Sequence, residues 1–364
     1  LSVVLLNLLM HVWAEGVAAE CPGVCPTCYA DDASTVSQGA RQLQPVLDFS
    51  GVFCNLTGMQ LNLPKCLSWS TSRKERALLP ELNLNGDSPK AAFHGRLLGA
   101  QVAYTGQHTA HIDVAPRFSK AELTSERIEA VGLPLDAKAD LFAACVIPKI
   151  LFDVQIAPLS KACLRSWRTR AARSIWGRGC PSRSLEMLFT LITKGHRCDP
   201  LQASVCRVMQ SAHRMMKRYS DHAATFWAML QAGVTLNNQH GPVARFKWAL
   251  KRLGWRVGED AYMVHRRNGM PVHVIECDES LFNHFVREDL RLALWQEAAR
   301  RRPDMAGCDA PQGIDRDATM SLTNASRGLP RRRLQTLLTG AVDTRKRRHR
   351  RGLAIHHHCF ACGP

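Results

Sequence analysis

The sequence predicts an α+β fold in which small antiparallel hairpins accompany a mainly helical remainder. Two short strand-like runs flank the adjacent acids Asp31 and Asp32, and two more flank Asn268-Gly269, a strong signal for a tight hairpin turn. Elsewhere apolar residues recur at helical spacing. With 364 residues and 46% hydrophobic content, the chain can bury a sizeable core divided among two or three units.

The chain opens in an apolar run from residue 1 to residue 14. Because Leu1 is not a methionine, we expect a truncated N-terminus. The run lacks the basic leader of a signal peptide and is too short for a confident membrane span. It therefore predicts a buried helix, whose core-facing side would carry Leu1, Val4, Leu5, Leu8 and Val12.

A second helix is expected from Gln42 to Phe53, with an apolar face formed by Leu43, Val46, Leu47 and Phe53. Residues 115–180 look helical, interrupted by Pro134 and Pro148. Within them, 163–176 predicts a basic amphipathic helix whose apolar face carries Leu164, Trp167, Ala171 and Ile175.

The basic residues of that helix, Arg165, Arg168 and Arg173, are expected to point away from its apolar face. Two interpretations stay open: they follow a nucleic-acid backbone, or they form an ordinary solvated face. We expect the two tryptophans of the helix to belong to the core rather than to stack on bases.

The region 181–302 is expected to be helical around the Asn268-Gly269 hairpin, whose strands would be 262–264 and 272–275. Before the hairpin, Gly241-Pro242 predicts the start of a helix that Gly254 ends. Its apolar face would carry Val243, Phe246, Leu250 and Leu253. Another helix is expected from residue 281 to 302, with an apolar stripe that begins at Phe282, Phe285 and Val286.

The chain is strongly basic, with a net charge of +17 and a pI of about 9.6. This disfavours an acidic ligand-binding protein and favours a polyanionic partner such as nucleic acid or an anionic membrane. Residues 327–351 contain ten Lys or Arg and one Asp, a local charge of +9, and include Arg331, Arg332 and Arg333. Fourteen cysteines without a repeating frame indicate reduced thiols in an intracellular protein rather than a secreted disulfide scaffold.

Asp31 and Asp32 are the residues that best suggest chemistry. Adjacent carboxylates repel each other and stay ionised most easily beside a cation. With a third acid from another strand, such a pair can hold two Mg²⁺ ions about 4 Å apart for nucleotidyl transfer. An isolated pair more often marks a solvated turn, so the surrounding sequence has to decide.

Tyr29-Ala30-Asp31-Asp32 resembles the Tyr-x-Asp-Asp box of reverse transcriptases. About 26 residues later, the segment from Gly58 to Lys65 resembles the Gly-Leu-x-Leu-Asn-x-x-Lys segment of non-LTR (LINE-type) retrotransposon enzymes. Leu97-Leu98-Gly99 resembles their Tyr-Leu-Gly strand along the primer, and Leu1-Ser2 the end of their Pro-Leu-Ser-Pro segment. The four segments occur in the family's order and near its spacing.

The resemblance implies an RNA-directed DNA polymerase fragment that uses Mg²⁺ or Mn²⁺, deoxynucleotides, an RNA template and a DNA primer. It implies that Asp31 and Asp32 bind the metal, Lys65 acts near the pyrophosphate, and Tyr29, Ala30, Leu98 and Gly99 contact primer or nucleotide. Its domains would be an incomplete palm (1–110), a thumb (111–180), a helical connection with a small hairpin (181–302) and a basic tail (303–364). The expected location is the nucleus, with no membrane partner.

The tail resembles the zinc-binding end of some LINE-type polyproteins, with Cys359 and Cys362 as a Cys-x-x-Cys pair. Zinc requires four ligands, and the second pair is missing; His356, His357 or His358 is a weak substitute. A metal at Cys21, Cys25 and Cys28 is disfavoured because a connecting loop is expected there.

Some features depart from the family. Val3 stands where a proline is usual, 15–27 is an insert rich in Cys and Pro, and the family's first catalytic aspartate would lie upstream of Leu1. We therefore expect the chain alone to be inactive as a polymerase. Two alternatives stay open: a decayed retroelement product that only binds nucleic acid, and a small zinc-containing interaction module with the polymerase part as its scaffold.

Overall fold

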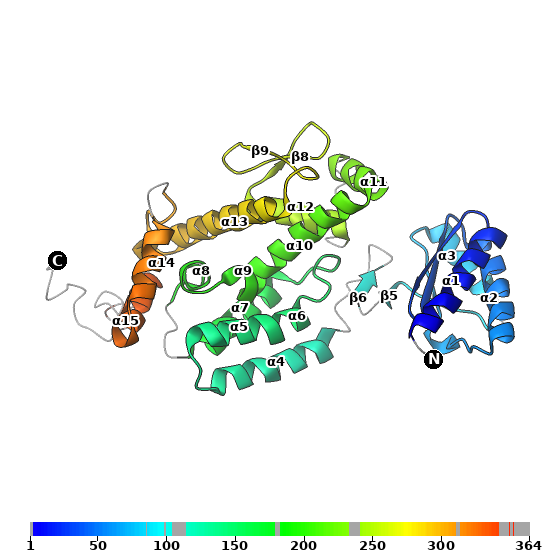
Figure 1. The fold of residues 1–364 in the computed structure, drawn as a ribbon, viewed down its shortest axis with the longest axis horizontal. Helices are drawn as coiled ribbons and strands as arrows, with labels where there is room; N and C mark the ends of the chain where they lie inside the picture. The colour runs from blue at the N-terminus through cyan, green and yellow to red at the C-terminus, as the bar shows by residue number, and fades with distance from the viewer. Residues whose placement is uncertain are drawn as a thin grey trace. The chain divides into compact units, whose positions relative to one another are not determined.

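The computed structural model describes residues 3–84, 86–97, 100–103, 114–178, 183–232, 241–310 and 314–341, together with His349 and Gly352. Within these residues the chain is mainly helical with a few small sheets, an α+β composition (Figure 1). It divides into two compact units, Leu1–Asp113 and Val114–Pro364.

The first unit contains every sheet but one of the described residues. Its helices are α1 (Val3–Glu20), η1 (Ala40–Gln42), α2 (Leu43–Thr57), η2 (Leu63–Lys65), α3 (Arg73–Leu78) and η3 (Leu79–Glu81). Its strands form three pairs: β1 (Val24–Tyr29) with β2 (Asp32–Ser37), β3 (Leu67–Ser68) with β4 (Lys90–Ala91), and β5 (His94–Leu97) with β6 (Ala100–Ala103).

The prediction for α1 was right about the helix and wrong about its buried face. Met10, Trp13 and Val17 face the core, whereas Val4, Leu5, Leu8 and Val12 are exposed, and Leu1 lies outside the described residues. The helix is apolar almost all round, so hydrophobic periodicity could not select a face. In the structure Trp13 Nε1 donates a hydrogen bond to Ser50 Oγ of α2, 3.0 Å away.

Two further features describe α1. Gly16 lies against Phe49 of α2, since a Cβ at Gly16 would come within 2.3 Å of the Phe49 ring. By length and composition alone, α1 could cross a membrane, and it is the one helix of the described residues that meets this test. A single N-terminal apolar helix is weak evidence for a membrane span.

The helix α2 matches the expected amphipathic pattern and joins two small cores. Val46 and Phe53 pack with α1 and β1, while Leu43 and Leu47 pack against Leu79 and its neighbours. Gly58 ends the helix in the left-handed conformation, with φ of 71°, a C-terminal position that glycine adopts without steric cost. The next segment leads to Lys65.

The second unit surrounds one continuous core. Its first helices are α4 (Ala115–Ala130), α5 (Leu135–Cys145), α6 (Ile147–Ile150), α7 (Lys161–Trp176), α8 (Leu185–Met187), the π-helix η5 (Leu188–Ile192) and α9 (Gly195–Cys198). Then follow α10 (Pro200–Arg218), α11 (Ser220–Gln231), α12 (Pro242–Leu253), α13 (Glu279–Arg301), η6 (Pro303–Met305), α14 (Arg316–Ala325) and α15 (Gly328–Leu338).

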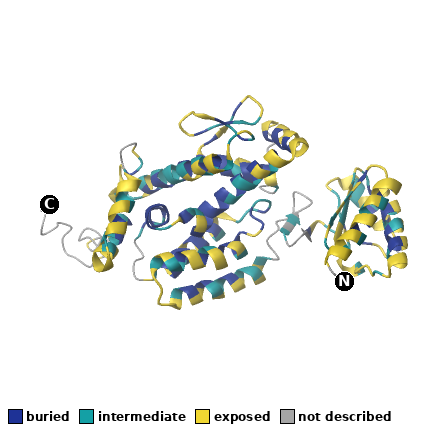
Figure 2. Cartoon of the chain, viewed as in Figure 1, coloured by how far each residue is buried: buried dark blue, intermediate teal, exposed yellow. Residues whose placement is uncertain are grey.

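The helix α10 lies at the centre of this unit and contacts α7, α9, α11, α12 and α13. Figure 2 shows the buried residues along it. The predicted face of α12 is buried at all four positions, and Gly254 ends the helix with φ of 75°. These outcomes confirm that periodicity and capping signals identified the helix and its end.

The Asn268-Gly269 hairpin is also confirmed. Strand β8 (Met263–His265) pairs with β9 (Pro271–His273), and β7 (Arg256–Val257) adds a third strand beside β8. Gly269 has φ of 85°, but Asn268 has no positive φ and the strands join through 266–270, so the turn is longer than the two-residue turn typical of Asn-Gly. Val264 and Val272 face each other in the ladder and join the core.

Candidate functional site

Asp31 and Asp32 lie at the tip of the β1–β2 hairpin, as predicted. Tyr29 pairs with Asp32 in the ladder, so the turn consists of Ala30 and Asp31 alone. Ala30 has φ of 52°, a left-handed conformation that costs a residue with a Cβ about 1–2 kcal/mol. Both aspartates are exposed, so their carboxylates are open to a ligand.

The hairpin has one covered face and one open face. Val24 and Cys28 pack against residues of α1 and α2, including Trp13 and Phe53. Because strand residues alternate between faces, Tyr29 and its ladder partner Asp32 share the open face. Tyr29 is 68% exposed. The two helices therefore support the hairpin from one side and leave its acidic tip accessible.

Lys65 lies in the same unit, at the end of the short helix η2, and is exposed. The backbone N–H of Lys65 donates to the Asn62 carbonyl, which fixes the turn. Among the described residues the structure records no hydrogen bond or ion pair between Lys65 and either aspartate. Leu98 and Gly99 lie outside the described residues, between the paired strands β5 and β6.

The oxygen donors at the hairpin tip have the chemistry that Mg²⁺ prefers. Within the described residues no group of three or more His, Cys, Asp or Glu side chains is placed to hold a metal ion. Among the described residues, the hairpin tip therefore offers a metal ion two carboxylates, those of Asp31 and Asp32, and no third acid beside them. Cys359, Cys362 and the three preceding histidines lie outside the described residues, and the predicted zinc site with them.

The basic face predicted for α7 needs a correction at Arg168. Arg165 and Arg173 are exposed, but Arg168 is only 8% exposed. Its Nε donates to Asp199 Oδ1 at 2.9 Å and its Nη1 to Glu186 Oε1 at 3.4 Å. A buried, paired guanidinium cannot reach a phosphate backbone. Trp167, in contrast, belongs to the core as predicted.

The arginine cluster of the tail lies on α15. Arg332 and Arg333 are exposed, whereas Arg331 is partly buried and pairs with Asp136 at 3.1 Å. A partly exposed pair of this kind contributes little to stability, and Arg331 can exchange Asp136 for another anion. Arg332 and Arg333 are therefore the freer members of the cluster.

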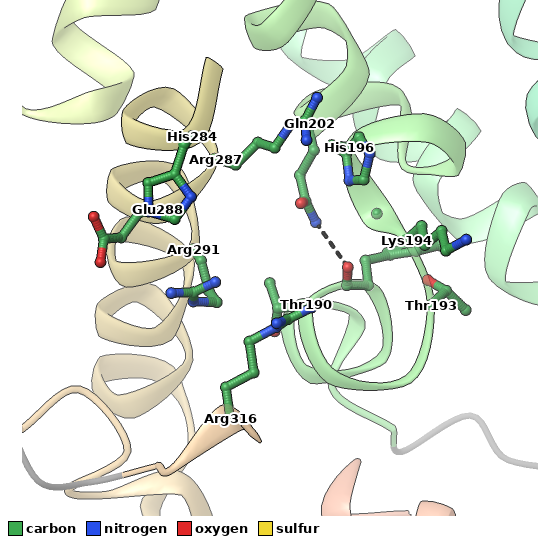
Figure 3. A pocket seen from close by; sticks show the side chains of 12 residues that line it. Thr190, Thr193, Lys194, His196, Gln202, His284, Arg287, Glu288, Arg291 and Arg316 are labelled. Carbon is green, nitrogen blue, oxygen red and sulfur yellow. Dashed lines mark hydrogen bonds between the residues drawn. The ribbon is translucent and has the colours of Figure 1, made fainter. Parts of the chain in front are cut away.

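The structure also contains a basic cavity that the sequence did not reveal (Figure 3). It has a volume of about 230 Å³ and lies between α13 and the η5–α9 turn of the second unit. Its lining includes Thr190, Thr193, His196, Gln202, His284, Arg287, Arg291 and Arg316. They come from three stretches, 189–202, 284–291 and Arg316. Within the second, His284, Arg287 and Arg291 follow the spacing of one face of α13, but no signal in the sequence links the three stretches, so only the folded chain brings them together.

Comparison with known proteins finds no family model, no curated protein and no solved structure that matches the chain. The resemblance to reverse transcriptases therefore depends on the ordered motifs themselves. Of these, the described structure gives a defined geometry to the acidic hairpin and to the segment that ends at Lys65.

Proposed function

We propose that the chain is part of an RNA-directed DNA polymerase of a non-LTR retrotransposon. One observation carries the proposal: Tyr29, Ala30, Asp31 and Asp32, in the order of the family's box, form the exposed tip of a hairpin that packs against two helices, with Ala30 and Asp31 as its turn. A two-residue hairpin turn itself requires a positive φ such as that of Ala30, so the support comes from the residue order of the box and from the second motif at Gly58–Lys65. The proposal uses both.

In this proposal Asp31 and Asp32 hold divalent metal through their carboxylate oxygens. The chemistry that Mg²⁺ supplies in such a site is activation of a primer hydroxyl and neutralisation of the leaving pyrophosphate. Lys65 carries a positive charge suited to the pyrophosphate, and Tyr29 offers an exposed ring beside the acids. The partners are an RNA template, a DNA primer and deoxynucleotides.

The experiment that tests the metal role is cleavage of the chain by Fe²⁺ substituted for Mg²⁺, in the presence of ascorbate and peroxide. Hydroxyl radicals cut the backbone beside the bound ion, so we expect fragments ending near residues 29–33, suppressed by excess Mg²⁺. Asp31→Asn should remove these cuts. Glu81→Gln changes an exposed acid of the same unit and should leave them unchanged. Cleavage at the hairpin that survives Asp31→Asn would refute the role.

A second candidate function is nucleic-acid binding without catalysis. The observation that favours it is the net charge of +17, with exposed Arg165, Arg173, Arg332 and Arg333. Under this alternative the chain binds RNA with a steep salt dependence, and iron makes no Mg²⁺-sensitive cuts at the hairpin. Because the chain alone is expected to be inactive in primer extension, the Mg²⁺-sensitive cuts at the hairpin and their loss in Asp31→Asn distinguish the two candidates.

A further inference from the structure

The basic cavity of the second unit has the charge of an anion site. Arg287 and Arg291 come from α13 and Arg316 from the start of α14, and Figure 3 shows all three around the opening. The one acid in the lining, Glu288, forms an ion pair with Arg266, 2.8 Å away. Arg266 also pairs with Asp289 at 2.9 Å, so Glu288 keeps part of its negative charge, but Lys194 and the three guanidinium groups of the lining still outnumber it.

Two of these arginines lack a strong partner among the described residues. The Nε of Arg291 is buried and has no hydrogen-bond acceptor there. An unsatisfied buried donor costs about 1–3 kcal/mol, so an acceptor that enters the cavity is favoured. Arg316 has only Asp317, 3.5 Å away, with both side chains exposed; such a pair is weak.

The opposite wall of the cavity is rigid. A Cβ at Gly195 would lie 2.0 Å from the Phe189 carbonyl oxygen, so glycine is required where the two backbone segments meet. Gln202 Nε2 donates to the same oxygen at 3.3 Å, a bond drawn in Figure 3. The hydroxyl of Thr190 accepts from Trp295 Nε1 at 2.8 Å. The wall is thus preorganised rather than shaped by a ligand.

His196 is a partly buried imidazole in the lining of the cavity. Burial, and then the nearby charge of Arg287, lower the pKa of this imidazole from its ordinary 6.5 to about 4. The ring is therefore neutral at pH 7 and adds a polar group without adding charge. An anion held near Arg287 would reverse part of that effect.

We propose that this cavity binds a phosphate group. Guanidinium groups form paired, charge-assisted hydrogen bonds to phosphate oxygens, and three of them line the opening. The volume of about 230 Å³ is several times the share of a water molecule, about 30 Å³, and so accommodates a phosphate. The proposal goes beyond the polymerase assignment and does not depend on it, because every residue involved belongs to the second unit.

The test compares the full chain with a variant carrying Arg287→Gln and Arg316→Gln. The control is Arg300→Gln, which removes an exposed arginine from the same helix. The first readout is the thermal shift produced by inorganic phosphate against chloride at equal ionic strength. The second is the Kd for a fluorescent single-stranded RNA as a function of salt. Circular dichroism verifies that the variants fold.

Phosphate should stabilise the wild type and the control, and the double variant should lose that shift. If the phosphate that binds in the cavity belongs to a nucleic-acid backbone, the double variant should also bind RNA about tenfold more weakly. Its log–log salt slope should fall by about 0.7 for each lost contact. Loss of the thermal shift with unchanged RNA binding would show that the cavity binds a small phosphate compound rather than RNA. If neither readout separates the double variant from the control, the proposal is overturned.

Discussion

The buried pair of Arg168 and Asp199 allows a quantitative prediction for Arg168→Met. Asp199 is fully buried and accepts hydrogen bonds from Arg168 Nε at 2.9 Å, Leu201 N at 3.1 Å and Gln202 Nε2 at 3.2 Å. Methionine keeps most of the aliphatic volume of arginine but removes the guanidinium. The substitution therefore leaves a carboxylate in the core without its cation.

Removing one partner of a buried pair costs about 3–5 kcal/mol, and we expect a loss of that size at pH 7. Burial raises the pKa of the Asp199 carboxyl, and loss of Arg168 raises it further. A group whose folded pKa lies above its unfolded pKa destabilises the fold when it is ionised. The deficit of the variant should therefore shrink as the pH falls from 7, by up to about 1.4 kcal/mol per pH unit.

The measurement is urea unfolding of the whole chain, followed by fluorescence of tryptophans including Trp167 beside the mutated position. Arg165→Met is the matched control, because Arg165 is exposed on the same helix, and its effect should stay within about 0.5 kcal/mol. If Arg168→Met costs less than about 1 kcal/mol, or weakens RNA binding while stability is unchanged, the structural role argued for Arg168 is refuted.

Three further predictions follow from other sites. Gly16→Ala should destabilise the first unit by about 1–2 kcal/mol, because its Cβ would meet the Phe49 ring at 2.3 Å; thermal unfolding measures this, and an unchanged midpoint would contradict the close approach. The stability contributed by neutral His196 should be complete above pH 6.5 and lost as the pH falls toward 4. The loss is about 2 kcal/mol after allowance for solvent screening, and His196→Gln should give a flatter pH profile in urea unfolding; equal profiles would rule this out. Changing Arg332 and Arg333 to Gln should flatten the salt dependence of RNA binding, since each released phosphate contact lowers the slope. A slope that does not change would make this cluster a bystander.

The sequence predicted helices and turns best where several local signals agree. In α12 a starting Gly-Pro, a buried stripe and the final Gly254 all indicate the same helix, and the structure has it at Pro242–Leu253. The acidic hairpin likewise followed from two strand-like runs around a two-residue turn. Local propensity and tertiary structure agree at these places.

Prediction from sequence failed where the choice depended on tertiary partners. Periodicity could not identify the buried side of α1, because apolar residues occur on both sides of the helix. The buried side carries Trp13, which donates a hydrogen bond to Ser50 of α2. The sequence placed Arg168 on a solvated face of α7. In the structure Arg168 is buried and pairs with Glu186 and Asp199, which lie later in the chain than α7. The basic cavity combines three stretches between residues 189 and 316, and no spacing along the chain connects one stretch to the next.

The register of the β1–β2 hairpin makes its two outer edges unequal. In an antiparallel ladder, alternate residues direct their backbone groups toward the partner strand, beginning here with Tyr29 and Asp32 at the turn. On β1, the outward N–H groups thus belong to positions 24, 26 and 28. Pro26 has no N–H, and Val24 N already donates to the Cys21 carbonyl at 3.2 Å. The β1 edge therefore keeps only one free donor among the described residues.

On β2 the outward groups belong to Ala33, Thr35 and Ser37, and all three retain their backbone N–H. An added strand needs a row of donors and acceptors, and a proline removes one and obstructs its neighbour's approach. A third strand would therefore extend this sheet beside β2, on the side of Asp32, and not beside β1. Pairing of this sheet with a strand of another molecule is expected at the same β2 edge.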